Sequence, residues 1–298
     1  MSKIDLHMHS ENSDDGDFSA SVLADMAMDA GLLTFSIADH NNVNSIAAAD
    51  DYCRDKDIEF IPAVELDCMF RGRVYHLLGY GIHYADKVYR DIWDDILGQE
   101  QHASRERVRL AREIGLEFLD EDIEALSKWG VIGGEMIGEA AMKYDADKKN
   151  PLLQPYYEGG ARSDNPYVNF WWDFCSQGKP VYSEVEFMPF EQAVATIDST
   201  GGVTVLAHPG NNVKEDMALL DAVMACGVKG VEAFSSYHNP EQNNIYKNYA
   251  LEHGYLLTCG SDFHGKNKPA ISMGSVDSQG MDDAMLDALH NAIKQMNP

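Results

Sequence analysis

The chain begins with a short stretch in which histidines and acids are spaced as metal ligands would be. Residues 4–16 read IDLHMHSENSDDG, an alternation of apolar and polar residues that is typical of a strand ending in a polar loop. Residues two apart on a strand share a face, so we expect His7 and His9 to point the same way, with Asp14 and Asp15 just beyond. Such a set can bind a divalent ion, although H-x-H alone also fits an ordinary polar edge strand.

The same residue types follow the other apolar runs of the sequence. They are His40 after FSIAD, Glu65 after FIPAV, His208 after VTVLA, and Asp262 and His264 after LLTCGS. The carboxyl ends of parallel strands meet at one face of an α/β barrel, where catalytic groups sit. We therefore expect these side chains to converge, although each one taken singly also fits a surface histidine or a turn aspartate.

His76 lies early in its apolar run, but a predicted hairpin brings it to the same place. Arg71 and Gly72 are expected to form a two-residue turn, which pairs residue 70 with 73. In that register Asp67 pairs with His76, and residue 65 pairs with 78. His76 then lies diagonally across from Glu65 on one face, within reach of a shared ion.

Predicted strands and helices alternate along most of the chain, which indicates a mainly parallel sheet or barrel. Helical spacing predicts helices over residues 19–30, 42–56, 190–199, 215–225, 240–253 and 282–296. Residues 92–128 are charged and helical, and residues 146–167 have no periodicity. We interpret residues 92–168 as a mainly helical cap inserted into a barrel made of residues 1–91 and 169–298.

Composition restricts the class of protein. The net charge of −26 over 298 residues argues against an extended nucleic-acid partner, which needs a basic face. No apolar run reaches the roughly 20 residues of a membrane helix, and no signal peptide is recognisable. Five scattered cysteines without a CxxC pair favour buried thiols in a reduced, cytoplasmic protein.

Taken together, these motifs resemble those of the PHP-domain (polymerase and histidinol phosphatase) metal-dependent phosphoesterases. The matching stretches are DLHMHS with SDDG, IADHN, AVE, the isolated His76, GGVTVLAHPG, GVEAF and GSDFHG. The resemblance implies a distorted (β/α)7 barrel with an inserted cap. Among PHP proteins the chain looks most like phosphatases acting on nucleoside phosphates, including AMP and 3′,5′-bisphosphates.

The resemblance also implies three divalent metal ions. By motif, His7, His9 and Asp262 match the first ion and Glu65 bridges. Asp14, His40 and His264 match the second, with the extra Asp15 of SDDG leaving that aspartate open. His76, His208 and Glu65 match the third. Mixed imidazole and carboxylate ligation suits Mn²⁺, Fe²⁺ or Zn²⁺ better than Mg²⁺.

The chain departs from such relatives in the cap, where they carry Arg-Pro-His after a glycine. The aligned residues here are Gly134, Glu135 and Met136. Whatever those Arg and His side chains do in relatives, this chain must do otherwise.

Four residues are candidates for substrate binding or catalysis. Asp39 is expected to orient an imidazole, or to form only a strand-end hydrogen bond. Arg105 and Arg107 match an arginine-containing cap helix of relatives and are candidates for gripping a second phosphate, or lie on a solvated helix face. His238 matches a position near the substrate, where it would donate a proton to the leaving group or bind phosphate, or pack a loop.

These features predict a metal-dependent phosphatase of nucleotides, with a metal-bridging hydroxide as the nucleophile. Other phosphoesters, such as histidinol phosphate or a sugar phosphate, are competing substrates. An exonuclease acting on short oligonucleotides and a metal-binding module without turnover are further alternatives. Metal analysis and phosphate release from a nucleotide panel separate these classes.

Overall fold

A computed structural model describes residues 2–297, in which strands and helices alternate along most of the chain. The strands are β1 (Ile4–Asp5), β2 (Thr34–Phe35), β3 (Glu59–Phe60), β4 (Ala63–Phe70), β5 (Arg73–Tyr80), β6 (Met188–Pro189), β7 (Val203–Leu206), β8 (Gly230–Ser235) and β9 (Leu256–Gly260). They form a three-stranded parallel sheet, β1-β2-β3, and a six-stranded sheet in the order β6-β4-β5-β7-β8-β9. The fold is thus α/β with a mixed sheet, because β5 runs antiparallel to both of its neighbours.

The helices cover the sheets and build a separate cap. They are α1 (Ala20–Asp29), α2 (Ile46–Cys53), α3 (Lys87–Glu113), α4 (Asp120–Leu126), α5 (Gly134–Tyr144), α6 (Pro166–Phe170), α7 (Phe190–Ser199), α8 (Pro209–Asn212), α9 (Met217–Met224), α10 (Pro240–His253) and α11 (Asp282–Met296). Short 3₁₀ turns lie at Gln154–Tyr156 and Gly265–Asn267, and a π-helical turn lies at Trp171–Cys175. The predicted ranges of α7, α10 and α11 are confirmed residue for residue.

The hairpin register predicted from the turn is also confirmed. Arg71 and Gly72 both have positive φ angles, 48° and 76°, as a type I′ turn requires. The ladder pairs Phe70 with Arg73 and Asp67 with His76. This register places Asp67 opposite His76 and Glu65 diagonally across from it, on the face where the site forms.

Within the described residues the ladders form two sheets and do not close into one barrel. Two contacts nevertheless join the sheets. The Leu6 N–H donates to the Cys259 carbonyl at 3.0 Å, between the ends of β1 and β9. His40, which follows β2, forms an isolated parallel bridge with Glu65 of β4. The residues following β1 and β2 therefore meet the six-stranded sheet at its β9 and β4 sides.

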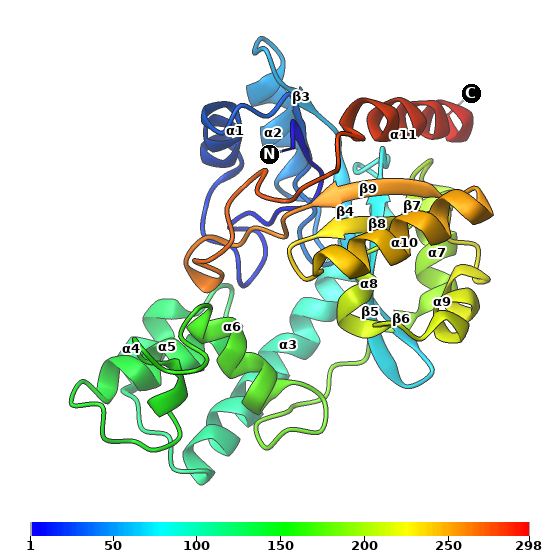
Figure 1. The fold of residues 1–298 in the computed structure, drawn as a ribbon. Coiled ribbons are helices and arrows are strands. Elements are labelled where there is room, and N and C mark those ends of the chain that lie inside the picture. The colour runs from blue at the N-terminus through cyan, green and yellow to red at the C-terminus, as the bar shows by residue number, and fades with distance from the viewer. Residues whose placement is uncertain (1, 298) are drawn as a thin grey trace.

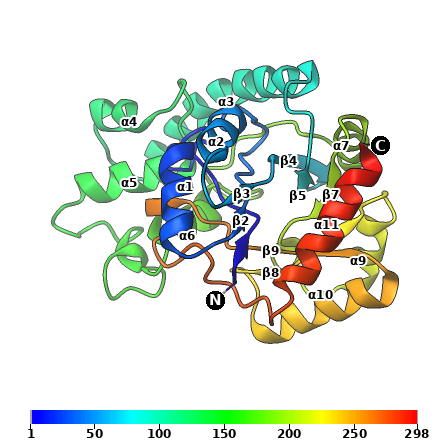
Figure 2. The ribbon, with the colours of Figure 1, turned by 90° about the horizontal axis from the view of Figure 1, so that it is seen from above.

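The cap has its own hydrophobic cluster, whose buried members run from Ala111 to Val181. This cluster extends past residue 168, where the sequence pattern places the end of the insertion. Figures 1 and 2 show α4, α5 and α6 together on one side, with α3 passing between them and the sheets. The side chain of Gln177 also joins the two parts, because its amide donates to the Gly72 carbonyl of the hairpin at 3.1 Å.

Two expectations from composition can be compared with the structure. All five cysteines are unpaired, and four of them are buried, as predicted for structural thiols. Among the described residues, every helix is too short or too polar to cross a membrane.

Candidate active site

Histidines and acids from far apart in the sequence converge where strands end. Of the nine residues that the motifs imply as metal ligands, all but Asp14 belong to groups whose donor atoms lie within 4.8 Å of one another. The groups are His7, His9, Glu65 and Asp262; His9, Asp15, His40 and His264; Glu65, His76 and His208; and His40, Asp67 and His76. Such a concentration of nitrogen and oxygen donors is what transition-metal ions bind.

Glu65, on β4, lies at the centre of the cluster and is fully buried. Its Oε2 atom lies 3.2 Å from a ring nitrogen of each of three histidines: His7, His9 and His40. Its Oε1 atom lies 3.0 Å from His76 Nδ1 and 3.2 Å from His208 Nε2. One carboxylate therefore faces five imidazoles, which is the position of a bridging ligand.

The spacing of the donor atoms fits ions. His9 Nε2 lies 3.0 Å from Asp262 Oδ1, and 3.2 Å from His7 Nε2. Ligand atoms about 2.1 Å from an ion lie about 3 Å from one another when they bind at right angles. The first group thus has the separations of a coordination sphere.

Several donor atoms in the cluster are buried and have no hydrogen-bond partner. They are Asp15 Oδ1, His40 Nδ1, Glu65 Oε2, Asp67 Oδ1 and His208 Nδ1. Orphaned buried polar atoms are rare in native proteins, because each costs the free energy of its lost hydration. Divalent ions would satisfy them, and the residues therefore fit such ions.

The titration of the cluster also fits cations. Burial alone would raise the pKa of Glu65, but the nearby histidines His7, His76 and His40 hold it well below the usual range. Burial lowers the pKa of His7, whereas Glu65, Glu232 and Asp262 raise it to well above its ordinary value. The Glu65 carboxylate is therefore ionised and attracts positive charge, as a carboxylate metal ligand must.

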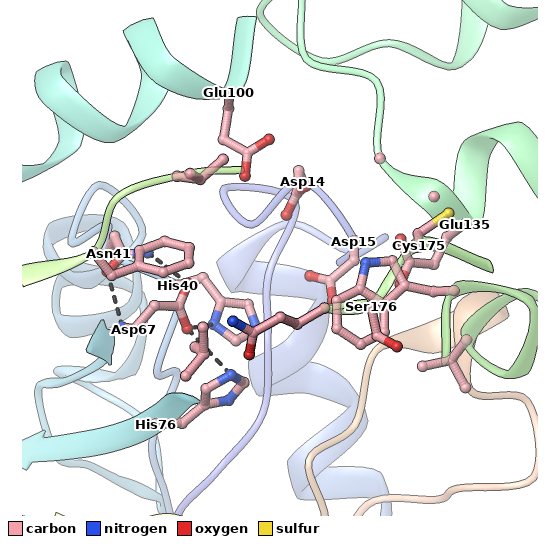
Figure 3. A pocket seen from close by; sticks show the side chains of 18 of the residues that line it. Asp14, Asp15, His40, Asn41, Asp67, His76, Glu100, Glu135, Cys175 and Ser176 are labelled. Atoms are coloured by element: carbon pink, nitrogen blue, oxygen red, sulfur yellow. Dashed lines mark hydrogen bonds and ion pairs between the residues drawn. The ribbon is translucent and has the colours of Figure 1, made fainter. Parts of the chain in front are cut away.

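In the loop after β1, the structure places Asp15 and not Asp14 among the candidate ligands. Asp15 Oδ2 lies 3.0 Å from His264 Nε2, whereas Asp14, which lies between Glu100 and the cluster (Figure 3), belongs to none of the donor groups. Burial and the charges of Asp15 and Glu100 raise the pKa of Asp14 to about 7. For Asp15, burial raises the pKa but His264 lowers it to well below the usual range.

This geometry separates the two aspartates experimentally. Asp15→Asn is expected to weaken metal binding at least about tenfold, because it removes a charged donor. Asp14→Asn, the matched control, is expected to keep the wild-type metal content. Elemental analysis after dialysis against defined free Mn²⁺ measures both variants. Loss of an ion from Asp14→Asn with full occupancy in Asp15→Asn would restore the ligand assignment of the motif.

Asp39 bonds to two serines of the loop after β1. Among the described residues, its carboxylate makes no hydrogen bond to an imidazole. Its carboxylate accepts hydrogen bonds from the Ser10 N–H at 2.7 Å and from the Ser13 hydroxyl at 3.1 Å. The Ser13 hydroxyl also lies 3.1 Å from His9 Nδ1. Asp39 therefore positions His9 through Ser13, one step further out than the sequence predicts.

Glu232, in the centre of β8, is a supporting residue that the sequence reading missed. It lies 2.9 Å from His7 Nδ1 and accepts the His208 N–H at 2.8 Å. A carboxylate on Nδ1 fixes the tautomer that leaves Nε2 free for an ion. An acid in the middle of the apolar run GVEAF was the available signal.

The structure does not support His238 as a proton donor. Its Nδ1 lies 3.1 Å from the Ala233 carbonyl, and its Nε2 accepts the Gly210 N–H at 2.9 Å. Both ring nitrogens are thus occupied by backbone, and the residue does not line the cleft described below. Burial lowers the pKa of His238, which is consistent with a neutral ring that ties two loops together.

The two candidate arginines of α3 point to different places. Arg107 is buried and lines the cleft, and its guanidinium donates to Glu100 at 2.5 Å and to the Ile132 carbonyl at 3.3 Å. Arg105 is exposed, lies outside the cleft and contacts His102. Of these two arginines, only Arg107 lines the cleft.

A cleft of about 770 Å³ opens from the cluster toward the cap. Its aromatic lining comprises Trp93, Trp129, Trp171, Trp172, Tyr182, Phe187 and Tyr237. Lys268 is buried in its wall and ion-pairs with Asp262. Glu135 lies on the cap side near Cys175 (Figure 3). Burial and the charges of Asp15 and Asp14 raise the pKa of Glu135 well above its ordinary value.

Comparison with known proteins agrees with this arrangement. The family model described as PHP domain matches residues 5–158, which is more than half of the chain. The chain is 26% identical over 284 residues to a 3′,5′-nucleoside bisphosphate phosphatase of Chromobacterium violaceum, covering 92% of this chain and 91% of that protein. It is also 26% identical over 268 residues to a 5′-3′ exoribonuclease of Haemophilus influenzae, covering 88% of this chain and 90% of that protein.

A solved structure shares the fold. A protein of Bifidobacterium adolescentis, described as a metal-dependent phosphoesterase, superposes with a TM-score of 0.77 and 23% identity. The superposition covers 97% of this chain and 96% of that one. The similarity therefore includes the cap as well as the sheets.

Proposed function

Because this chain belongs to the PHP-domain family, we propose that it is a metal-dependent phosphoesterase that releases inorganic phosphate from phosphate monoesters of nucleotides. The observation that carries the proposal is the set of buried donor atoms around Glu65 that have no hydrogen-bond partner and open onto a cleft. The relative named as a nucleoside bisphosphate phosphatase supports the substrate class.

Three groups, which are those implied by the family but with Asp15 in place of Asp14, would hold three ions of Mn²⁺, Fe²⁺ or Zn²⁺. His7, His9 and Asp262 would bind one ion, with Glu65 shared. Asp15, His40 and His264, together with His9, would hold a second, and Glu65, His76 and His208 a third. When bound, such ions supply a water of lowered pKa and positive charge for the phosphoryl oxygens.

The residues of the chain itself orient these groups and the substrate. Glu232 fixes the tautomer of His7, and Asp39 positions His9 through Ser13. The Lys268 ammonium, next to Asp262, adds positive charge to the wall of the cleft on the cluster side. These contacts hold the donor atoms in place before substrate arrives, so little reorganisation is needed during the reaction.

The cleft supports a nucleotide-sized substrate. Its volume of about 770 Å³ lies within the range of about 300–1,000 Å³ usual for small-molecule sites. Trp93 and Trp129 pack edge to face at 5.2 Å in its wall, and such rings can stack on a base. We propose that the cap formed by residues 92–168, extended to about residue 181 by its hydrophobic cluster, sets the selectivity.

We further propose that the two sheets act as one distorted (β/α)7 barrel. The Leu6–Cys259 backbone hydrogen bond and the His40–Glu65 bridge support this arrangement. A barrel presents the residues after its strands at one face, which is where the donors gather.

Arg107 is expected to contribute affinity for the part of the nucleotide beyond the scissile phosphate. Arg107→Ala should raise KM for the best nucleotide far more than for a minimal aryl phosphate. Losing a charge-assisted contact costs roughly 1.5–3 kcal/mol, or about tenfold to a hundredfold in kcat/KM. Arg105→Ala, on the same helix but exposed, is the matched control and should behave as wild type.

The control for folding is Arg107→Lys, which keeps a positive charge beside Glu100. Equal losses of Arg107→Ala on both substrates would mean that the arginine supports the fold or the common phosphoryl site. No loss on either substrate would show that Arg107 only pairs with Glu100 and does not contact the substrate.

The test of the function is phosphate release by the Mn²⁺-, Fe²⁺- or Zn²⁺-loaded protein from a panel of phosphoesters. The panel includes AMP, a 3′,5′-bisphosphate, histidinol phosphate, a sugar phosphate and a 5′-phosphorylated trinucleotide. The highest kcat/KM is expected for a mononucleotide. A preference for the trinucleotide, with release of nucleotides, would instead support the exoribonuclease activity named for one relative. If the protein binds metal but turns over none of these substrates, the result would instead support a metal-binding module without catalytic activity.

A further inference from the structure

Asp67 lies next to the ligand groups and was not assigned by any motif. It follows Glu65 by two residues on β4, so both side chains lie on the same face of the strand. Asp67 Oδ1 lies 3.3 Å from His40 Nδ1 and 3.3 Å from His76 Nε2. The three donors form a group in which the atoms lie within 4.8 Å of one another.

The carboxylate of Asp67 is held in this position by Asn41. The Asn41 amide donates to Asp67 Oδ2 at 2.8 Å, and the Asp67 N–H donates to Asn41 Oδ1 at 3.0 Å (Figure 3). Asn41 adopts a left-handed conformation with φ of 52°, which asparagine tolerates better than most residues. This reciprocal pair leaves Oδ1 as the free oxygen, aimed at the two histidines.

That free oxygen is buried without a hydrogen-bond partner, and so is His40 Nδ1. If Asp67 served only to orient an imidazole, its Oδ1 atom would accept a well-aligned N–H bond from one of the two rings. Neither ring makes such a bond in the structure. An acceptor and a ring nitrogen that are both unsatisfied, 3.3 Å apart, have the separation of two ligands on one ion.

From this geometry we infer that Asp67 is a metal ligand, and that His40, Asp67 and His76 form a cation site on the hairpin side of Glu65. The site takes a divalent ion that accepts mixed nitrogen and oxygen donors, such as Mn²⁺, Fe²⁺ or Zn²⁺. His40 and His76 also belong to neighbouring groups, so Asp67 would complete the ligand set of an ion already counted among the three and adds no fourth ion. The inference rests on the metal centre of the proposed function.

The test compares three variants of the full chain by metal content. Asp67→Asn keeps the shape and an oxygen that can accept a hydrogen bond, but it removes the charge. Asp67→Ala removes both, and Asn41→Gly removes the clamp without straining the backbone, since glycine tolerates φ of 52°. Each protein is dialysed against defined free Mn²⁺, and bound metal is measured by elemental analysis and by competition with a chelating dye.

We expect Asp67→Asn and Asp67→Ala each to lose close to one ion per chain, with the weakest dissociation constant raised at least about tenfold. Asn41→Gly should fall between these variants and wild type. Asp14→Asn controls for a change from carboxyl to amide at the cleft outside the donor groups. Circular dichroism confirms that each variant is folded.

Two outcomes overturn the inference. Full metal content in both Asp67 variants would show that Asp67 does not bind an ion. Full content in Asp67→Asn together with loss in Asp67→Ala would show that Asp67 only orients an imidazole. Neither result depends on turnover, so failure of the nucleotide panel and failure of this inference are distinguished by separate measurements.

Discussion

Replacing Glu65 with glutamine is expected to remove most activity while leaving the protein folded. Glu65 presents its two oxygens to five histidines at 3.0–3.2 Å. Glutamine keeps the shape but loses the shared negative charge, and its NH₂ group cannot coordinate an ion. Removing one electrostatic element of a preorganised site costs about 10²–10³ in kcat, and loss of a bridging ligand should lie at or above that range.

The measurement is kcat/KM on the best nucleotide, together with metal content and thermal unfolding of Glu65→Gln. Glu59→Gln is the matched control, because Glu59 lies on β3, is exposed and pairs with His290. It should retain wild-type turnover. A folded Glu65→Gln protein with wild-type turnover and metal content would contradict the bridging assignment.

Removing the metal ions is expected to have the other large effect. Phosphate monoesters hydrolyse extremely slowly without catalysis, and the neutralisation of phosphoryl charge by ions is worth several kcal/mol. Dialysis against a chelator should therefore lower phosphate release by on the order of a thousandfold or more. Adding Mn²⁺, Fe²⁺ or Zn²⁺ back should restore it.

Circular dichroism before and after chelation separates loss of ions from loss of fold. The main hydrophobic cluster is built from apolar side chains that include those of β4, β5, β7 and β8, so the secondary structure should persist. Undiminished phosphate release by protein shown by elemental analysis to be metal-free would contradict the proposed chemistry.

Local rules predicted much of the fold. The bounds of α10 follow from Asn239 as N-cap, Pro240 at the first helical position and Gly254 at the C-terminal end with φ of 73°. The β4–β5 register follows from the turn at Arg71 and Gly72. The short strands β1, β2 and β3, with two residues each, were harder, because tertiary pairing decides where their ladders end.

The candidate site was predictable where residues follow strands and less so in loops and on single strands. Spacing from His9 cannot distinguish Asp14 from Asp15, because neighbouring loop side chains point in different directions. Asp67 carried a usable signal, since it shares a strand face with Glu65. The sequence does not show which oxygen of Asp67 faces the histidines. That follows from Asn41, which comes after a different strand and holds the other oxygen, Asp67 Oδ2.

The contacts of Arg107 and His238 were among the least predictable features of the site. Arg107 pairs with Glu100, which lies about two turns earlier on the same helix. Its guanidinium also donates to the Ile132 carbonyl. His238 uses both ring nitrogens on the backbone of Ala233 and Gly210. Nothing in the local sequence of either residue specifies these contacts.

Metal content per chain tests the central claim most directly. The protein, saturated with Mn²⁺ or Zn²⁺ and then freed of loosely bound metal, is analysed for metal and protein on the same sample. The convergent donors around Glu65 predict close to three divalent ions per chain. No more than one ion per chain after saturation with each metal would contradict a trinuclear centre, and with it the proposed basis of phosphoester hydrolysis.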